Sequence, residues 1–267
     1  MGFYSHRQLK SLGQHWLNDR SVLEKILLAA NLQPYDRVLE IGPGRGALTE
    51  LLLNSKAKLI HAVELDPRLV KGLNSKFSGN PKFTLTLGNV LSIPLLTPEG
   101  IPANKVVANI PYNITGQILD LLIGRLGNFS SHIYDDLVLL MQKEVADRIL
   151  AVPGHSSFSA LSVRIQLMAD CFCICNVSPK CFEPPPKVQS KVILIKPLSH
   201  QDRLPMELER KINELLSAAF HSRRKKLRNS LIKLAPLPFL ESLMNEIDIT
   251  LDQRPQELSP KSWIALA

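Results

Sequence analysis

Three glycines and one carboxylate have the spacing of a nucleotide-binding turn. Gly42, Gly44 and Gly46 follow a short apolar run, expected to be a buried strand, and open a segment with a helical pattern. Glycine is favoured at such a turn because a side chain would keep the backbone away from a ligand. Glu64 ends the next apolar run, about twenty residues later, where a carboxylate can accept hydrogen bonds from both hydroxyls of a ribose. The pattern predicts a nucleoside-containing cofactor.

Two cofactors compete for this pattern. A dinucleotide such as NAD usually takes the fingerprint G-x-G-x-x-G, whereas the third glycine here comes one residue early. S-adenosylmethionine (SAM) has no pyrophosphate and does not need the longer loop. A tight turn without any ligand is the third interpretation.

The segment Asn109-Ile110-Pro111-Tyr112 carries groups suited to methyl transfer onto an adenine amine. That amine is a poor nucleophile because its lone pair is delocalised into the ring. The Asn109 side-chain oxygen and the Ile110 carbonyl could accept its two hydrogens and free the lone pair, so that catalysis rests on positioning and acceptor dipoles. Pro111 would fix the turn, and Tyr112 would stack on the base and favour a nearby sulfonium. The alternative is an Asn-Pro turn with a packed tyrosine.

A proline-rich loop at residues 177–188 carries Phe182. Its three consecutive prolines stiffen the backbone. Phe182 could stack on the target base opposite Tyr112, and base–aromatic stacking is worth about 1–3 kcal/mol. The alternative is that Phe182 anchors the loop in the core.

A cluster of cations lies near the C-terminal end. The candidate phosphate-contacting residues are Arg223, Arg224, Lys225, Lys226 and Arg228. We expect a short helix in which Leu227 and Leu231 pack inward while the cations face phosphates. A solvated charged face is the alternative.

Alternating apolar and helical patterns predict the elements that position these residues. Helices are expected at 22–30, behind a capping box of Ser21 and Glu24, and at 47–53, 67–77, 116–123, 143–150 and 158–168. Strands are expected at 37–41, 59–64, 83–87, 105–108, 136–141, 171–177 and 188–195. The alternation implies βαβ units and a mostly parallel sheet, with the last two strands as an antiparallel edge hairpin. A proline-bounded linker at 197–205 leads to a wholly helical segment. We therefore expect an α/β domain at 1–198 and a small helical domain at 199–267.

Composition favours a polyanionic partner. The 267 residues carry a net charge of +8, which suits nucleic acid or an anionic surface. No apolar run has the length of a membrane span, and the N-terminal residues lack the apolar region of a secretory signal. We expect a cytoplasmic protein that uses no membrane.

The four cysteines favour a structural role over a metal site. Cys171, Cys173 and Cys175 alternate along an expected strand, and Cys181 follows. C-x-x-C spacing and neighbouring histidines are absent from this stretch, so buried reduced thiols are expected, without a metal.

Together the motifs resemble one family. Glu40 to Gly46, Asn109 to Asn113 and Gly13 to Leu17 look like the KsgA-type rRNA adenine N6,N6-dimethyltransferases, over about residues 13–231. The resemblance implies a Rossmann-like SAM-dependent methyltransferase domain with a small all-helical C-terminal domain. The pattern of Phe220 to Leu231 is also typical of this family.

The resemblance also assigns residues to the cofactor. Its binding set would be Gln14, His15, Leu17, Gly42, Gly44, Gly46, Glu64, Leu65, Asn89, Val90 and Asn109. His15 and Leu17 would line the methionine end of SAM, and Asn89 would receive the adenine amine. Two departures stand out: the family usually has aspartate at position 89 and commonly phenylalanine at position 16, where this chain has Asn89 and Trp16.

The implied activity is dimethylation of two adjacent adenosines near the 3′ end of small-subunit rRNA, in a pre-ribosomal particle, by a monomer. One rival is a large-subunit rRNA methyltransferase of the macrolide-resistance type, of which the pattern of Phe220 to Leu231 is much less typical. Another is a non-catalytic ribosome-assembly factor, against which the intact Asn109–Tyr112 motif argues. A NAD-dependent oxidoreductase is disfavoured by the glycine spacing.

Overall fold

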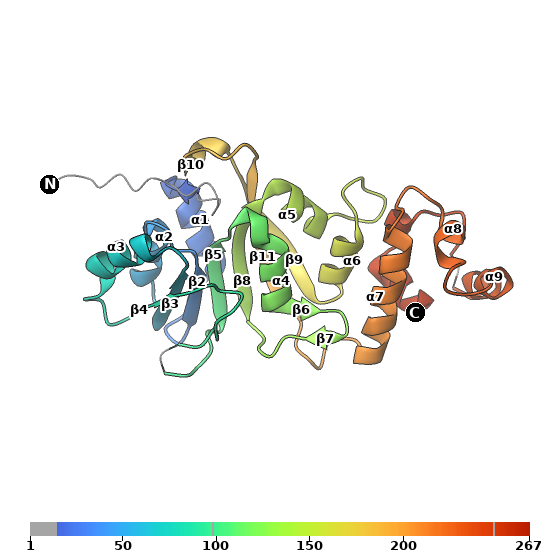
Figure 1. Cartoon of the computed structure of the whole chain (residues 1–267), viewed down its shortest axis with the longest axis horizontal. Helices are drawn as coiled ribbons and strands as arrows, with labels where there is room; N and C mark the ends of the chain where they lie inside the picture. Colours follow the sequence, from blue (N-terminus) through green and yellow to red (C-terminus); the bar gives the residue numbers. More distant parts are fainter. Residues whose placement is uncertain (1–14, 98, 248) are drawn as a thin grey trace. The chain divides into compact units, whose positions relative to one another are not determined.

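The computed structural model describes residues 15–97, 99–247 and 249–267, and its chain divides into two compact units (Figure 1). The first unit runs to Leu122 and adds His132–Ala146 and Phe172–Pro197. The second unit consists of Ile123–Ser131, Asp147–Cys171 and Leu198–Ala267. The boundary predicted after residue 198 lies one residue from the observed division between Pro197 and Leu198. The second unit also includes two earlier segments of the chain, which the sequence did not predict.

One sheet of seven strands organises the first unit, in the order β4-β3-β2-β5-β8-β11-β9 (Figure 1). The strands are β2 (Arg37–Ile41), β3 (Leu59–Glu64), β4 (Phe83–Leu87), β5 (Lys105–Asn109), β8 (Asp136–Gln142), β9 (Ala169–Val177) and β11 (Ser190–Pro197). The strands from β4 to β8 pair in parallel, and β11 pairs antiparallel with β8. The mostly parallel sheet predicted from the sequence is confirmed. Its central strands are continuous apolar runs because helical crossovers cover both faces of a parallel sheet.

Helices connect these strands as the sequence predicted, with one correction. They are α1 (Arg20–Ala30), α2 (Ala47–Leu53), α3 (Pro67–Phe77), α4 (Thr115–Ile123), α5 (Lys143–Leu150) and α6 (Ala160–Gln166). The predicted capping residue Ser21 is wrong. Asp19 caps α1, because its carboxylate accepts the Val22 N–H at 3.1 Å, and Ser21 lies inside the helix.

A two-stranded ribbon in the first unit was not predicted. Strand β1 (Trp16–Leu17) pairs antiparallel with β10 (Phe182–Glu183). The Asn18 N–H donates to the Cys181 carbonyl at 2.9 Å, and the Asn18 side chain donates to Glu183 at 3.1 Å. The N-terminal segment is thereby joined to the proline-rich loop.

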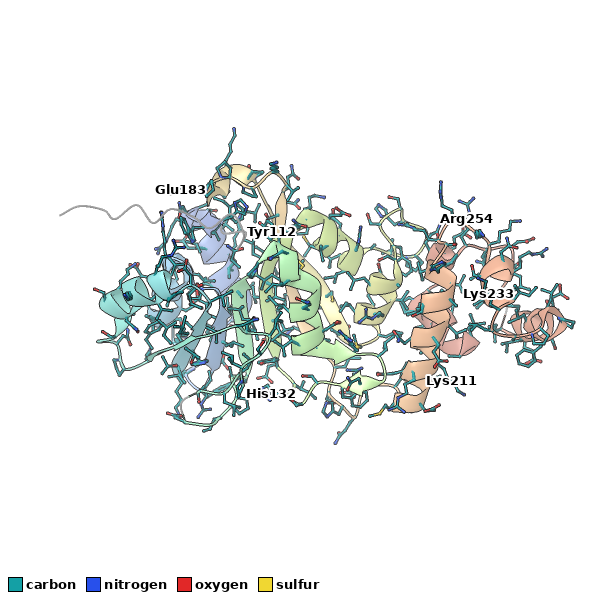
Figure 2. The ribbon with its side chains drawn as sticks, in the orientation of Figure 1. Tyr112, His132, Glu183, Lys211, Lys233 and Arg254 are labelled. Carbon is teal, nitrogen blue, oxygen red and sulfur yellow. The ribbon has the colours of Figure 1, made fainter. Side chains whose placement is uncertain are left out.

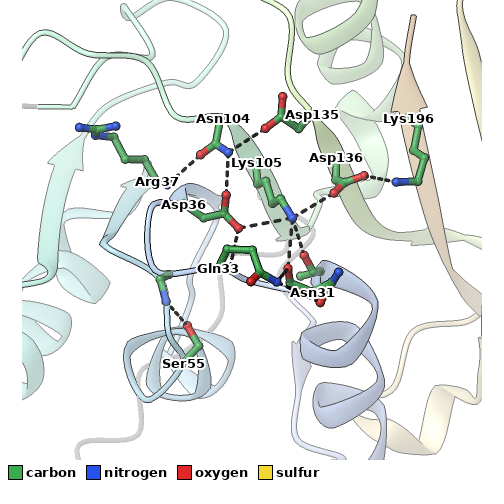
Figure 3. A network of polar contacts seen from close by, with 12 residues as sticks. Asn31, Gln33, Asp36, Arg37, Ser55, Asn104, Lys105, Asp135, Asp136 and Lys196 are labelled. Carbon is green, nitrogen blue, oxygen red and sulfur yellow. Dashed lines mark hydrogen bonds and ion pairs between the residues drawn. The ribbon is translucent and has the colours of Figure 1, made fainter.

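A polar network holds the amino ends of β2, β5 and β8 together (Figure 3). The Lys105 ammonium lies 3.0 Å from Asp136 and 3.4 Å from Asp36, and donates to the Ala30 carbonyl at 3.0 Å. Lys196 pairs with the far side of Asp136 at 2.8 Å. Lys105 and Asp36 are buried, so water does not stabilise their charges. The opposite charges within the network stabilise them instead. The network lies at the end of the sheet opposite to Asn109.

The second unit is mainly helical. It contains α6, α7 (Met206–Phe220), α8 (Leu227–Leu231), α9 (Leu237–Glu246) and α10 (Pro260–Leu266), with the short strands β6 (Gly124–Arg125) and β7 (Asn128–Phe129). The predicted linker at 197–205 is anchored through Arg203, whose buried guanidinium pairs with Glu209 at 2.6 Å and donates to the Ile123 and Arg125 carbonyls. In the part of the chain that the structure describes, no helix has the length and apolarity needed to span a membrane.

The prediction of a buried cysteine face is wrong. Cys173 is exposed, while Cys171, Cys175 and Cys181 are half-buried, and all four thiols are free. The reason is that β9 is the last strand of the sheet, so only one neighbouring strand lies beside it and shields its side chains.

Candidate active site

A cavity of about 230 Å³ lies in the first unit, where β2, β3 and β5 end and the segment after β4 begins. One water molecule takes about 30 Å³, so there is room for an organic ligand. Most of the predicted site residues line this cavity: His15, Leu17, Gly42, Gly44, Glu64, Leu65, Asn89, Val90, Asn109, Ile110, Pro111 and Tyr112. In α/β sheets of this kind the carboxyl ends of the strands are where ligands bind.

Three predicted site residues stand apart from that set. Gln14 lies outside the described residues. Gly46 has a φ of +81°, and a Cβ there would lie 2.6 Å from the Phe77 ring, so its lack of a side chain serves packing. Phe182 is 4% exposed and belongs to the hydrophobic core. The anchoring interpretation of Phe182 fits this position, and its stacking role stays a prediction.

The ribbon of β1 and β10 lies against the glycine loop. A Cβ on Gly44 would lie 2.7 Å from the Trp16 ring, and Gly44 also has a φ of +59°. The Arg45 guanidinium lies 3.8 Å from the centroid of the Trp16 ring and 3.6 Å from the Glu183 carboxylate. Trp16 therefore packs directly on the loop that the glycines form.

Glu64 is a buried carboxylate held by backbone N–H groups. One oxygen accepts from Leu65 and Asp66, both at 2.9 Å, and the other accepts from Gly44 at 3.2 Å. Burial raises the pKa of Glu64, and these three donors partly offset the rise. The oxygen facing Gly44 has one such donor and keeps acceptor capacity for a ribose hydroxyl.

Glu40 was not predicted as a site residue. Its side chain lines the cavity and is 1% exposed, yet neither carboxyl oxygen has a hydrogen-bond partner among the described residues. Burial raises the pKa of Glu40 to about 8; the nearby Thr49 hydroxyl opposes the rise and the charge of Glu64 adds to it. The available sequence signal was an acidic residue in the otherwise apolar run at 38–41.

Asn109 and Tyr112 are both held by neighbours. The Asn109 amide donates to the His15 carbonyl at 3.1 Å, which leaves its side-chain oxygen as an acceptor. The Tyr112 hydroxyl is 2.5 Å from the Ser190 hydroxyl, and its ring stacks on the His15 ring with centroids 6.0 Å apart. Burial raises the pKa of Tyr112, so the phenol stays neutral. Figure 2 shows Tyr112 and Glu183 at one end of the sheet and His132 at the other.

Asn89 uses its acceptor oxygen within its own turn. That oxygen accepts the Leu91 N–H at 3.0 Å, and the side chain is otherwise exposed at the cavity wall. A carboxylate at this position could keep the same bond and offer a second oxygen to a ligand.

The basic cluster of the second unit differs from its prediction. Residues 221–226 form a turn before α8, so most of the five cations are not helical. Arg223 donates to the Ser156 carbonyl at 2.5 Å, while Lys226 and Arg228 each pair with Asp252 at 3.2 Å. Arg224 and Lys225 are exposed, and neither forms an ion pair with another described residue. Leu227 and Leu231 are fully buried, as predicted.

Across residues 15–97, 99–247 and 249–267, no group of three or more His, Cys, Asp or Glu side chains could hold a metal ion.

Comparison with known proteins places the chain among rRNA methyltransferases. Residues 5–267 match the family described as ribosomal RNA adenine dimethylase. A ribosomal RNA small subunit methyltransferase A from Prochlorococcus marinus strain MIT 9211 is 57% identical over 267 residues, covering all of this chain and 95% of the relative. The protein of the same name from Synechococcus sp. strain CC9311 is also 57% identical over 267 residues, covering all of this chain and 96% of the relative.

Solved structures share the fold. A dimethyladenosine transferase from Plasmodium falciparum superposes with a TM-score of 0.79 at 26% identity, covering 94% of this chain and 96% of that one. The 23S rRNA methyltransferase ErmE superposes with a TM-score of 0.73 at 24% identity, with coverages of 94% and 97%. The predicted Rossmann-like methyltransferase fold is thereby confirmed.

Proposed function

Because the chain belongs to the ribosomal RNA adenine dimethylase family, we propose that its cavity binds SAM and presents a target adenine to it. The protein is an enzyme that dimethylates adenine in the rRNA of the small ribosomal subunit. One observation supports the proposal above all: a single cavity unites the glycine loop, the Glu64 carboxylate and the segment Asn109–Tyr112.

The residues present fit SAM. Glu64 ends β3 and would accept the ribose hydroxyls, while Asn89, after the neighbouring β4, would lie at the adenine. The methionine part would then lie between the ends of β2 and β5, beside Gly42 and Asn109. Glu40 is a buried, unpartnered carboxyl group on that side of the cavity, which suits a ligand with a cationic end.

When bound, SAM supplies a methyl group already activated on a sulfonium. The protein then has to place and orient the acceptor amine. Asn109 is suited to this because its amide N–H donates to His15, which leaves the oxygen free to accept an adenine N6–H. The Ile110 carbonyl would take the second hydrogen, and the neutral ring of Tyr112 would hold the base by stacking.

The substrate details are proposed from the family resemblance. We infer that each of two adjacent adenosines near the 3′ end of the 16S rRNA receives two methyl groups on N6. Cations of the second unit would contact the rRNA backbone of a pre-ribosomal particle in the cytoplasm. Arg224 and Lys225 have no internal ion pair among the described residues and are the cations best placed for phosphates. We further propose that the enzyme is a monomer.

Labelled SAM tests the assignment. The protein is incubated with undermethylated small subunits, and the modified bases are mapped. We expect label on adenine N6 near the 3′ end, no label with Asn109→Ala, and none with large subunits. Label on large-subunit rRNA would instead favour the macrolide-resistance rival, and binding of the particle without methylation would favour an assembly factor.

A further inference from the structure

We propose that Ser190 is a positioning residue for methyl transfer: its hydroxyl group holds the Tyr112 ring at the place where that ring stacks on the target adenine. The inference rests on the proposed function, in which Tyr112 stacks on the base, and adds to it the residue that fixes Tyr112. Ser190 is not among the residues that line the cavity, so its effect on the reaction would pass through Tyr112.

Ser190 is a polar residue in an apolar row. It begins β11, where Ser190, Val192 and Leu194 alternate toward the same face of the sheet. Val192 belongs to the hydrophobic core and Leu194 packs against it, and Ser190 in the same row is 0% exposed. Burial of a hydroxyl group costs free energy unless the group has a hydrogen-bond partner. The partner here is the Tyr112 hydroxyl, at an O–O distance of 2.5 Å.

The Tyr112 hydroxyl group has its explanation in the same contact. Stacking on a base uses the aromatic ring alone, and a phenylalanine would supply such a ring. The hydroxyl group is not suited to take a proton from the adenine amine, because burial raises the pKa of Tyr112 and keeps the phenol neutral. Its hydrogen bond to Ser190 therefore serves to place the ring.

Sheet pairing fixes the position of Ser190. Tyr112 lies in the turn after β5, and β8 and β11 follow β5 in the order of the sheet. Ser190 pairs with Gln142 of β8, and β8 pairs with β5 through Leu140, which lies opposite Asn109. The hydrogen bond thus joins Tyr112 to a strand two positions away from β5. Because the three strands form one continuous ladder, Ser190 holds a fixed position relative to Asn109.

The contact of Tyr112 with His15 leaves the reach of the ring undetermined. The two rings are stacked, with centroids 6.0 Å apart and planes at 26° to one another. Stacked rings tolerate lateral offsets, so this contact lets the Tyr112 ring slide within its own plane. A hydrogen bond fixes the hydroxyl oxygen to within about half an ångström. Ser190 therefore sets how far the ring extends from β5, and with it the place of the base relative to Asn109.

Loss of this hydrogen bond should lower turnover and leave binding intact. Displacement of a reacting group by about 1 Å can lower a rate about a hundredfold, and a ring that keeps its core packing should move less. We expect Ser190→Ala to lower the single-turnover methylation rate of saturating small subunits roughly tenfold. Its affinities for S-adenosylhomocysteine, measured by calorimetry, and for small-subunit particles should match those of the parent.

A double-mutant cycle separates positioning from stability. Ser190→Ala leaves the Tyr112 hydroxyl without its partner, and Tyr112→Phe leaves the Ser190 hydroxyl without its partner, so each should lower the free energy of unfolding. The double variant removes both hydroxyl groups together and should regain stability. Its methylation rate should stay low, because nothing then places the ring at position 112. Urea unfolding and single-turnover methylation measure the two quantities in all four proteins.

A buried serine of the second unit provides the matched control. Ser162 is also 0% exposed, and its hydroxyl donates to the Arg148 carbonyl at 2.5 Å. Ser162→Ala should lower the free energy of unfolding and leave the methylation rate unchanged.

The outcomes are separable. A methylation rate that returns with stability in the double variant, or a rate of Ser190→Ala equal to that of the parent, would overturn the role of Ser190 and leave the proposed function standing. Absence of methylation of small subunits by the parent would overturn the proposed function together with the inference. If Ser190→Ala does not fold, as checked by circular dichroism, the double variant compared with the parent decides alone.

Discussion

Glu64 has two tasks in the structure, because its carboxylate accepts the Gly44 N–H and faces the cavity. Glu64→Ala should weaken binding of SAM at least tenfold, since each hydrogen bond to a charged group contributes about 1.5–3 kcal/mol. Affinity for small-subunit particles should change little. Calorimetry measures the affinity for SAM, and a binding assay measures the affinity for small-subunit particles. Glu183→Ala, which replaces an exposed glutamate, is the matched control. Equal SAM affinity in Glu64→Ala and the parent would refute the assignment to the ribose.

Position 89 offers a gain of function. The Asn89 oxygen already accepts the Leu91 N–H, so Asn89→Asp should keep that bond and offer a second oxygen to the adenine amine. SAM should bind the variant at least as tightly as the parent, whereas Asn89→Ala should bind it less tightly. Titration of all three proteins measures this. Weaker binding by Asn89→Asp would mean that the turn contacts the cofactor in another way.

At the residue scale, the sequence predicted which residues line the cavity better than it predicted which side chains are buried. Glycines, Asn109 and Tyr112 belong to motifs whose chemistry depends on spacing, and these residues meet in one cavity. The burial of Phe182 and Glu40 depends on what covers them, and the core that contains Phe182 is built from segments far apart in the chain. A single sequence does not display that packing.

At the scale of elements, the turn before α8 has its own test. Arg224→Ala combined with Lys225→Ala should weaken particle binding and flatten its salt dependence, by roughly 0.7–0.9 in log–log slope for each phosphate that the variant no longer neutralises. SAM affinity should stay unchanged because the cavity belongs to the first unit. Particle affinity across a salt series measures the slope. The control variant combines Lys226→Ala with Arg228→Ala, which removes two cations already paired with Asp252. A larger loss of particle affinity in the control variant would contradict the assignment of Arg224 and Lys225 to phosphates.

The polar network at the amino ends of β2, β5 and β8 should contribute to the free energy of unfolding. Lys105→Met leaves Asp36 and Asp136 without their shared buried cation, and loss of one partner from a buried pair costs about 3–5 kcal/mol. Lys196→Met, which removes a half-exposed partner of the same Asp136, should cost less than about 1 kcal/mol. Urea unfolding at pH 7 compares the two variants, and equal losses would contradict a special role for Lys105.

The same network predicts a pH window. Burial alone would raise the pKa of Asp136, but hydrogen bonds from Lys196 and Lys105 lower it overall. Its stabilising contribution is therefore complete above the unfolded value, about 3.9, and is lost as pH falls through the lower folded value. Burial opposes the charge on Lys105, yet Asp136 and Asp36 raise its pKa, so that contribution is lost only above about pH 10. The cost of Lys105→Met should shrink at pH 3.

Helix and strand bounds in the α/β part were largely predictable, and the exceptions share a cause. The buried strands are apolar runs between turn residues, so β2 and β3 match their predicted bounds. The ribbon of β1 and β10 has two residues in each strand and depends on a partner about 165 residues away. The basic turn at 221–226 has helix-forming residues, and its shape depends on tertiary contacts such as that of Arg223 with Ser156.

At the scale of the whole molecule, the division into two units predicts how a ligand stabilises the chain. The cavity residues all belong to the first unit. A ligand at 100 times its dissociation constant stabilises the state that binds it by about 2.7 kcal/mol. S-adenosylhomocysteine should therefore raise the unfolding temperature of the first unit and leave any separate transition of the helical unit in place. Calorimetric melting measures this, with Glu64→Ala as the control; a shift confined to the helical unit would contradict the location of the site.

The ribbon over the glycine loop has a consequence for the newly made chain. Asn18 and Glu183 are 165 residues apart, and at about 5–20 residues per second the ribosome needs roughly 8 to 33 s to make the stretch between them. Gly44 and Glu64 are synthesised early, but Trp16 has no strand to pair with until β10 emerges. A chain released before that point would carry the glycine loop without the ribbon that packs on it. The wall of the cavity that Trp16 and Leu17 form is therefore completed only after most of the protein has been translated.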